Sequence, residues 1–349
     1  MSRMNASVCG LGAAVPPGRF QGELWDEFFA DHYDGNALAR QIWMNAGVAY
    51  RHGVADPMVE DVREWGTQRR MERFLETALP LGRDALEAAL EEAGVEPADV
   101  GLLTVVSCTG YATPGLDILL ARDLGMGDRV QRLHVGHMGC YAAVPGLAAV
   151  SDAAVARGKV GAMLCLELPS LHIQPPTRDV EQMVAHALFA DAAAAAVVVP
   201  GRPGLELVDV VARTDAEHAA MMTWDVTDQG FRMGLSPAIP SVLERHVGGV
   251  VDELLGAHGL VAADVAGWAV HPGGPRILDV IAEQVGLDDG DLEASNGVLR
   301  DYGNCSSATV MLVLQRVLEE GPPAHGDHVV CMAFGPGLTL YAALLRRRD

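Results

Sequence analysis

The sequence predicts an α/β protein built from two similar halves, because a pattern of helix and strand occurs twice. In this pattern an amphipathic helix ends at a glycine, and Ala-Asp-Val then leads into a short apolar strand. It spans residues 81–106 and again residues 242–270, with the Ala-Asp-Val segments 165 positions apart. Since alternating strands and helices pack as sheets covered by helices, we expect buried mixed sheets between helical layers.

A second repeated pattern places two polar residues at equivalent positions. Cys140 follows a glycine and opens a predicted helix, which a glycine and the apolar strand 162–166 follow. Asn304 also follows a glycine, opens a predicted helix and precedes the apolar strand 329–333, at an offset of 164 residues. Two matches in the same order and nearly the same register predict a duplicated α/β unit.

A turn-rich link separates the two units. Residues 201–204 read Gly-Arg-Pro-Gly between two predicted strands, and such glycine and proline pairs are typical of turns. We therefore predict a first half of residues 1–200, which carries Cys140, and a second half of residues 201–349, which carries Asn304.

Composition excludes several classes of function. The formal net charge of −21 argues against nucleic-acid binding, which requires a basic surface. No apolar run approaches the ~18 residues of a membrane span, and residues 1–12 lack a signal-peptide pattern. None of the six cysteines forms a CxxC pair or a zinc-like cluster. We expect a cytoplasmic protein that holds no metal and binds neither membranes nor nucleic acid.

Cys140 is a candidate nucleophile. It is expected at a helix N-terminus, where the helix dipole favours the thiolate form of cysteine. Gly139 permits a tight turn and a close approach of a substrate arm. The alternative is an ordinary buried cysteine, because free cysteines are often core residues.

Two further polar residues are predicted to converge on Cys140. His271 follows an apolar strand in a rigid His-Pro-Gly-Gly-Pro loop, and as imidazolium it can hold a thiolate. Asn304 supplies an amide donor that does not titrate and that can stabilise a developing oxyanion together with His271. Cys-His-Asn sets also occur in cysteine hydrolases, although the duplicated fold does not suggest one. A non-enzymatic scaffold would be expected to lack at least one of the three residues.

Five motifs resemble the signatures of type III polyketide synthases, the chalcone synthase family, and their order fits nearly the whole chain. They lie at residues 139–140, 187–191, 268–275, 303–307 and 334–339. The His-Pro-Gly-Gly-Pro and Phe-Gly-Pro-Gly-Leu-Thr motifs are the most specific. They separate this family from the ketosynthase III enzymes of fatty-acid synthesis, which share only the Cys, His and Asn.

The resemblance implies a thiolase-like, five-layered αβαβα fold and a homodimer. It implies that an acyl starter moves from coenzyme A onto Cys140 and that malonyl-CoA loses CO₂ against His271 and Asn304. The enolate then attacks the Cys140 thioester, and repeated rounds followed by cyclisation give a pyrone or phenolic product. No cofactor beyond the coenzyme A thioester substrates is implied.

The resemblance also implies the residues of a pocket. Phe189 matches one gatekeeper phenylalanine between the pantetheine tunnel and the cavity, and the second gatekeeper position falls on the softer Met233. Trp224 and His172 stand where plant chalcone synthases carry glycine and threonine. The other matches are Cys108 and Thr109 in the cavity wall, Thr113 in the loop that enters the partner subunit's cavity, and Gly335, Pro336 and Gly337 in the loop that shapes the cavity. Met233, Trp224 and His172 have a simpler alternative as packing residues.

The nucleotide-binding region departs from the family. Plant members bind the phosphates of coenzyme A with lysines near residues 40–51, where this chain has none. Arg40 and Arg51 are the candidate replacements. A weaker nucleotide site would suit a starter carried by an acyl carrier protein, so the alternative function is a single-round, ketosynthase III-like enzyme that uses carrier-bound substrate.

Overall fold

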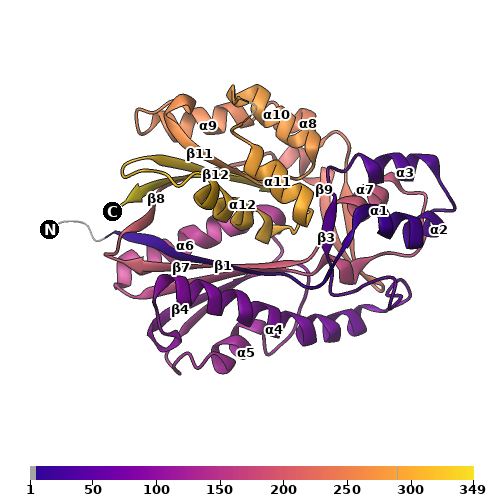
Figure 1. The fold of residues 1–349 in the computed structure, drawn as a ribbon, viewed down its shortest axis with the longest axis horizontal. Coiled ribbons are helices and arrows are strands. Elements are labelled where there is room, and N and C mark those ends of the chain that lie inside the picture. The colour runs from indigo at the N-terminus through magenta and orange to yellow at the C-terminus, as the bar shows by residue number, and fades with distance from the viewer. Residues whose placement is uncertain (1–4, 289) are drawn as a thin grey trace.

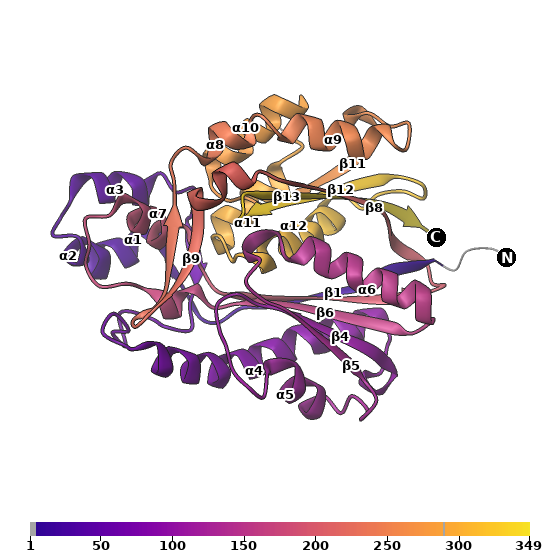
Figure 2. The ribbon, with the colours of Figure 1, turned by 180° about the vertical axis from the view of Figure 1, so that it is seen from behind.

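The chain folds into five layers that alternate between helices and sheet, as Figures 1 and 2 show. The computed structural model describes residues 5–288 and 290–349, so the first four residues of the segment considered for a signal peptide lie outside it. From one outer face to the other, the helices of the three helical layers are α4 (Thr67–Ala93) and α5 (Leu116–Asp123), then α6 (Ala143–Arg157) and α12 (Ser307–Glu320), then α9 (Val247–Gly256) and α10 (Pro275–Val285). This arrangement confirms the predicted α/β layers.

Two sheet layers lie between these helices. In the described residues nine strands are hydrogen-bonded in the order β11-β12-β13-β8-β1-β7-β6-β4-β5. The junction between β1 and β8 consists of only two residue pairs, and beyond it the strands diverge into two layers (Figure 1). The strands of the first layer are β1 (Ala6–Ala14), β4 (Val100–Val106), β5 (Gln131–Val135), β6 (Val160–Glu167) and β7 (Ala192–Pro200). Those of the second are β8 (Gly204–Thr214), β11 (Val265–Val270), β12 (His328–Gly335) and β13 (Thr339–Arg348).

The remaining elements gather at one end of the layers, opposite the two termini (Figure 1). They include two short antiparallel pairs, β2 with β3 and β9 with β10. Their bounds are β2 (Gly18–Phe20), β3 (Tyr50–His52), β9 (Met222–Thr227) and β10 (Gly230–Leu235). The helices there are α1 (Gln21–Leu24), a π-helix (Trp25–Phe29), α2 (Ala30–His32), α3 (Ala37–Met44), α7 (Val180–Leu188), α8 (Ile239–Leu243) and α11 (Glu293–Tyr302).

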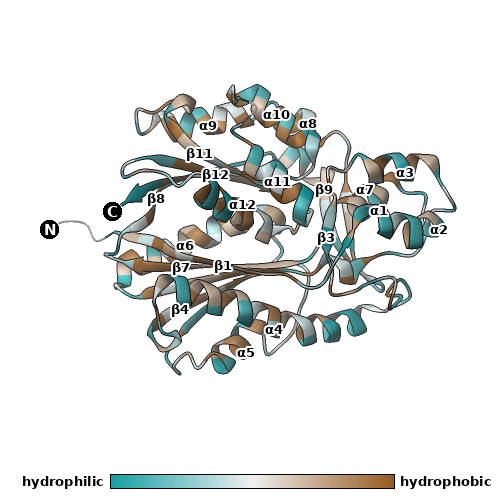
Figure 3. Ribbon diagram, viewed as in Figure 1, coloured by the Kyte–Doolittle hydropathy of each residue, from teal (hydrophilic) through white to brown (hydrophobic). Residues whose placement is uncertain are grey.

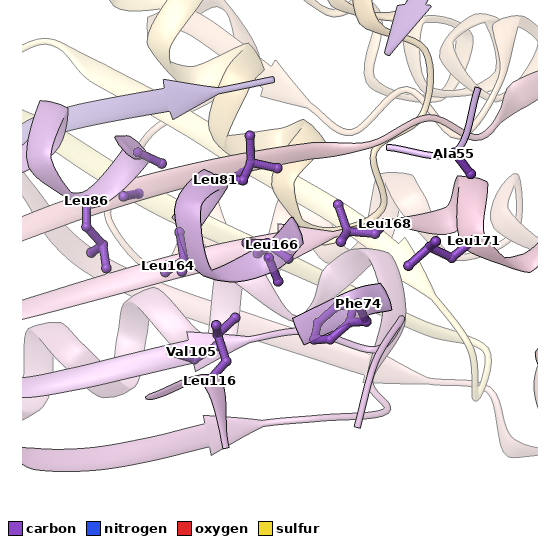
Figure 4. Close-up of a cluster of buried hydrophobic side chains, with 14 of the residues drawn as sticks. Ala55, Phe74, Leu81, Leu86, Val105, Leu116, Leu164, Leu166, Leu168 and Leu171 are labelled. Atoms are coloured by element: carbon purple, nitrogen blue, oxygen red, sulfur yellow. The ribbon is translucent and has the colours of Figure 1, made fainter. Parts of the chain in front are cut away.

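Each space between layers is filled by apolar side chains. Phe74 and Leu81 of α4 lie over Leu164 and Leu166 of β6, as Figure 4 shows. A second core surrounds α6 and α12 between the sheets, and a third lies between the second sheet layer and helices α8 to α10. Hydrophilic residues are concentrated on the outer faces of α4, α9 and α10 (Figure 3). Burial on both sides explains why the sheet strands read as continuous apolar runs.

Three helices differ from the sequence prediction. Helix α4 begins at residue 67 rather than 81 and continues through Pro80, because a buried face that includes Phe74 anchors the additional turns. The helix predicted over residues 242–258 is divided into α8 and α9, and His246 in the break bonds Asp215 at 2.8 Å. Helix α12 begins at Ser307, so Asn304 lies before the helix rather than at its first turn.

One helical segment, residues 139–157, is long and apolar enough to span a membrane by composition alone. It includes α6, which lies between the two sheet layers (Figure 2). Its apolar residues pack there against both sheets, so its position as a core helix explains its composition.

Candidate active site

Cys140, His271 and Asn304 line one cavity of about 300 Å³. Cys140 lies in a 3-10 turn, Gly139–Tyr141, immediately before α6. His271 follows the last residue of β11, and Asn304 lies between α11 and α12. The duplicated fold therefore brings together the three residues that the sequence singled out, although they come from three distant segments.

Close backbone packing explains the glycines around Cys140. Gly139 has a φ of 75°, and a Cβ on it would lie 2.6 Å from the Cδ of Pro336. A Cβ on Gly335 would lie 3.2 Å from the backbone nitrogen of Cys140 and 2.9 Å from the ring of Tyr141. The Gly-Cys and Phe-Gly-Pro-Gly motifs are thus two sides of one tight contact behind the candidate nucleophile.

His271 presents a buried imidazole whose nitrogens are available. Its backbone N–H donates to the carbonyl of Met332 at 2.8 Å, and its ring lies edge-on to Phe334 with 5.5 Å between centroids. Among residues 5–288 and 290–349, neither ring nitrogen has a hydrogen-bond partner. Since buried polar atoms are nearly always paired, these nitrogens are suited to a ligand in the cavity.

Asn304 is held by both its backbone and its side chain. Its N–H donates to the carbonyl of Leu188, and its carbonyl accepts from the N–H of Ala190, each at 2.9 Å. Its Oδ1 accepts from the N–H of Ser306 at 2.9 Å, which leaves the Nδ2 amide as a donor for the cavity. The two backbone hydrogen bonds, to Leu188 and Ala190, form a β-bridge between Asn304 and Phe189.

Burial opposes the thiolate and imidazolium pair that the sequence predicts. Burial raises the pKa of the Cys140 thiol to about 12, partly offset by the Ser306 hydroxyl. Burial also lowers the pKa of His271 to about 3. Cys140 lies in the first turn of the helical segment 139–157, but loss of hydration is the largest influence on the pKa of its thiol. The free site therefore favours a neutral thiol and a neutral imidazole, with His271 able to act as a base.

Phe189 stands at the junction of three cavities. It lines the 300 Å³ cavity, a cavity of about 90 Å³ beside Cys140, and a further cavity of about 180 Å³. Met233 and Trp224 line both the 90 Å³ and the 180 Å³ cavity. They are a cross-strand pair, with Trp224 on β9 and Met233 on β10. The position of Phe189 fits the gate that the resemblance implied.

Bulky side chains fill the space around the 90 Å³ cavity. The Nε1–H of Trp224 donates to the carbonyl of Cys108 at 2.7 Å. The ring of His172 is fixed as well, with its Nε2 bonded to the carbonyl of Thr109 at 2.7 Å and its Nδ1 accepting from the N–H of Phe231 at 2.9 Å. Cys108 and Thr109 line the small cavity, whereas His172 lines only the 180 Å³ cavity. Burial lowers the pKa of His172 to about 3.

The sequence analysis missed Glu167, a fully buried carboxyl at the end of β6. It accepts hydrogen bonds from the Thr109 hydroxyl at 2.7 Å, the Ser307 hydroxyl at 2.6 Å and the Cys108 N–H at 3.1 Å. Burial raises its pKa. The carboxyl thus joins the cavity wall to the start of α12. An acid that ends an otherwise apolar strand was the available signal.

Of three further predicted site residues, Arg51 lines the 180 Å³ cavity, and Arg40 and Thr113 lie outside all three cavities. Arg51 is buried, and its guanidinium donates to the carbonyls of His186 and Phe189 at 2.5 and 3.0 Å. It is therefore committed to the interior, which contradicts a role as a phosphate ligand. Arg40 is exposed on α3 and lines none of these cavities, and the exposed Thr113 lines none either.

The chain is similar to known proteins over nearly its whole length. Residues 54–203 match the family of chalcone and stilbene synthases in its N-terminal domain, and residues 208–348 match its C-terminal domain. A 1,3,6,8-tetrahydroxynaphthalene synthase of Streptomyces peucetius subsp. caesius is 35% identical, covering 97% of this chain and 93% of its own length. A 3,5-dihydroxyphenylacetyl-CoA synthase of Streptomyces toyocaensis is 33% identical, and the match covers 97% of this chain and 89% of that protein. The crystal structure of 1,3,6,8-tetrahydroxynaphthalene synthase from Streptomyces coelicolor A3(2) superposes with a TM-score of 0.92, at 28% identity, over 98% of this chain and 99% of that one.

Proposed function

Because this chain belongs to the chalcone and stilbene synthase family, we propose that Cys140, His271 and Asn304 are its catalytic residues. The chain is a type III polyketide synthase, a transferase that joins acyl units by decarboxylative condensation. The observation that carries the residue assignment is the shared 300 Å³ cavity, in which the ring of His271 and the amide of Asn304 have free hydrogen-bonding groups.

In the loading step, neutral His271 takes the proton of the Cys140 thiol. The resulting thiolate attacks the carbonyl carbon of an acyl-CoA starter, and the amide of Asn304 donates to the oxyanion that forms. The tetrahedral intermediate collapses with release of the coenzyme A thiolate, which takes the proton back from His271. The acyl group then remains as a thioester on Cys140.

In the condensation step, malonyl-CoA loses its carboxylate as CO₂, and the bonding electrons pass into an enolate. The enolate oxygen is stabilised by donors from Asn304 and from the N–H of neutral His271. The enolate carbon attacks the Cys140 thioester and displaces the thiolate. The chain, two carbons longer, is now a coenzyme A thioester and can be loaded again on Cys140.

The small cavity beside Cys140 favours a small acyl or malonyl starter. Its volume is about 90 Å³, and Phe189, Met233 and Trp224 separate it from the larger spaces. We propose that the extended chain is cyclised to a pyrone or phenolic product. The single-round ketosynthase alternative is not favoured.

The other features of the protein remain proposals. We propose two domains, residues 1–200 and 201–349, which supply the strands of the two sheet layers. We propose a cytoplasmic homodimer, and the exposed edge strand β5 and Tyr111, which is 65% exposed, leave surface that a second copy could cover. We expect no metal or organic cofactor apart from the coenzyme A thioesters.

Mass spectrometry of the purified protein with malonyl-CoA and a panel of acyl-CoA starters tests this function. We expect an acyl adduct on Cys140 and release of products extended more than once. Cys140→Ala should abolish the adduct and extension, whereas Cys9→Ala, far from the cavity, should preserve both. Normal extension by Cys140→Ala would refute the nucleophile, and a single extension with every starter would refute repeated condensation.

A further inference from the structure

The cavity that leads to Cys140 has an almost uncharged wall. Helix α3 contributes Ile42, the residues just after it contribute Asn45 and Ala46, and helix α7 contributes Val180 and Val184. No Asp, Glu or Lys is present among the residues that line this cavity in the described part of the chain. The cation of helix α3, the exposed Arg40, does not line this cavity.

Arg276 is the one arginine that lines this cavity within the described residues. It is the second residue of α10, directly after the His-Pro-Gly-Gly-Pro loop that begins with His271. The catalytic histidine and Arg276 are thus fixed to one rigid loop, five residues apart. The side chain of Arg276 is 64% exposed, as expected for a group at the opening of the cavity.

The present partners of Arg276 are weak. Its guanidinium lies 3.7 Å from Asp279 and 3.8 Å from Glu283, and each carboxylate is 60% exposed on the same helix. Exposed ion pairs of this kind contribute little free energy, so they are readily exchanged for a phosphate. The N-terminal end of α10 adds positive potential at the same place.

We propose that Arg276 binds the phosphate at the end of the pantetheine arm of the thioester substrate, and that coenzyme A is its source. The inference rests on the proposed function, because it places the thioester carbon at Cys140 and its arm in the 300 Å³ cavity. Arginine forms strong charge-assisted hydrogen bonds with phosphate. In a protein with a net charge of −21, one local cation at the opening also offsets the repulsion of an anionic substrate.

Steady-state kinetics with three malonyl thioesters test this contact. Malonyl-CoA and malonyl-phosphopantetheine carry the phosphate next to the arm, and malonyl-pantetheine does not. We expect Arg276→Ala to raise the KM for the first two substrates about 10-fold or more, the change that loss of one charge-assisted contact gives. The kcat should be nearly unchanged, and the KM for malonyl-pantetheine should equal that of the wild type. Arg276→Lys should restore part of the difference.

Two control variants sharpen the result. Arg83 on α4 is also an exposed arginine beside carboxylates of its own helix, and Arg83→Ala should leave all three KM values unchanged. Arg40→Ala tests the α3 alternative, and a rise in KM there with none in Arg276→Ala would overturn the proposal. An equal rise for all three thioesters in Arg276→Ala would also overturn it, because it would indicate damage to the cavity.

The carrier-bound source is tested separately with a starter on a loaded acyl carrier protein. Use of that starter, with no use of the acyl-CoA, would refute coenzyme A as the source. If wild-type protein condenses none of the thioesters, the proposed function fails. If the wild type is active and Arg276→Ala behaves identically with malonyl-CoA, only the role of Arg276 fails.

Discussion

Trp224 should limit the length of the polyketide, and its replacement by alanine should lengthen the products. Its side chain lines both the 90 Å³ cavity beside Cys140 and the neighbouring 180 Å³ cavity. Removal of this shared wall would merge two spaces whose volumes sum to about 270 Å³, before the volume of the lost indole is added. The enlarged space would accept longer starters and additional malonyl units.

The same substitution has a cost in stability that the structure bounds. The indole donates to the carbonyl of Cys108 at 2.7 Å and packs edge-on against His172 and Phe231, with centroids 5.4 and 5.9 Å apart. Truncation of a fully buried tryptophan costs about 3–5 kcal/mol, and Trp224 is only partly buried. We therefore expect a loss of about 2–3 kcal/mol, which urea denaturation will measure, and a folded variant.

Liquid chromatography with mass spectrometry, run with acyl-CoA starters of increasing chain length, gives the product profile. Trp224→Phe is the graded control, because it keeps an aromatic ring in the wall while it removes the second ring of the indole and the hydrogen bond to Cys108. Its products should be closer in length to those of the wild type than the products of Trp224→Ala. A folded Trp224→Ala variant with unchanged starter range and unchanged extension number would refute the reasoning that this wall sets the chain length.

Three further predictions follow from other contacts. Phe189→Ala should change starter preference, because the ring lines all three cavities; unchanged selectivity across the same starters would argue against a gate. Glu167→Ala should lower the free energy of unfolding by about 3 kcal/mol or more, because it leaves the donors of Cys108, Thr109 and Ser307 buried and unpaired. Glu167→Gln should lower it less, because the amide oxygen of glutamine still accepts hydrogen bonds from some of these donors. Equal urea midpoints for the two variants would contradict this difference. The free energy of unfolding should fall as pH drops from 6.5 towards 4, because the pKa values of His172 and His271 are about 3 in the folded protein and about 6.5 in the unfolded chain. The unfolded state alone then binds protons, at up to about 1.4 kcal/mol per pH unit for each histidine. Asp191 and Glu167 oppose this trend, because burial raises the pKa of Asp191 to about 6 and also raises that of Glu167. His32 and His186 reinforce it, because burial lowers their pKa values, so a stability that rises over this range would refute the neutral histidines.

The parts of the site that could be predicted from sequence are those with local causes. The glycines beside Cys140 and in the Phe-Gly-Pro-Gly loop mark close backbone approach, which only glycine permits. The repeated pattern of helix and strand predicted which segments share a cavity. By contrast, the burial of Arg51 and the bonds of Glu167 depend on residues more than 50 positions away. The acid at the end of an apolar strand marks Glu167 as unusual, but no local pattern reveals the distant partners of Glu167 or Arg51.

The hydrogen bonds of residues 188–190 connect the proposed gate to the proposed catalytic donor. The carbonyl of Leu188 and the N–H of Ala190 both bond the backbone of Asn304, and the residue between them is Phe189. Arg51 holds the carbonyl of Phe189 from the other side. The backbone of the gate and the position of the Asn304 amide are therefore fixed by one set of bonds, whereas the Phe189 ring is free to vary. A change in the size of the Phe189 side chain should therefore alter the proposed gate without moving the amide that we propose stabilises the enolate.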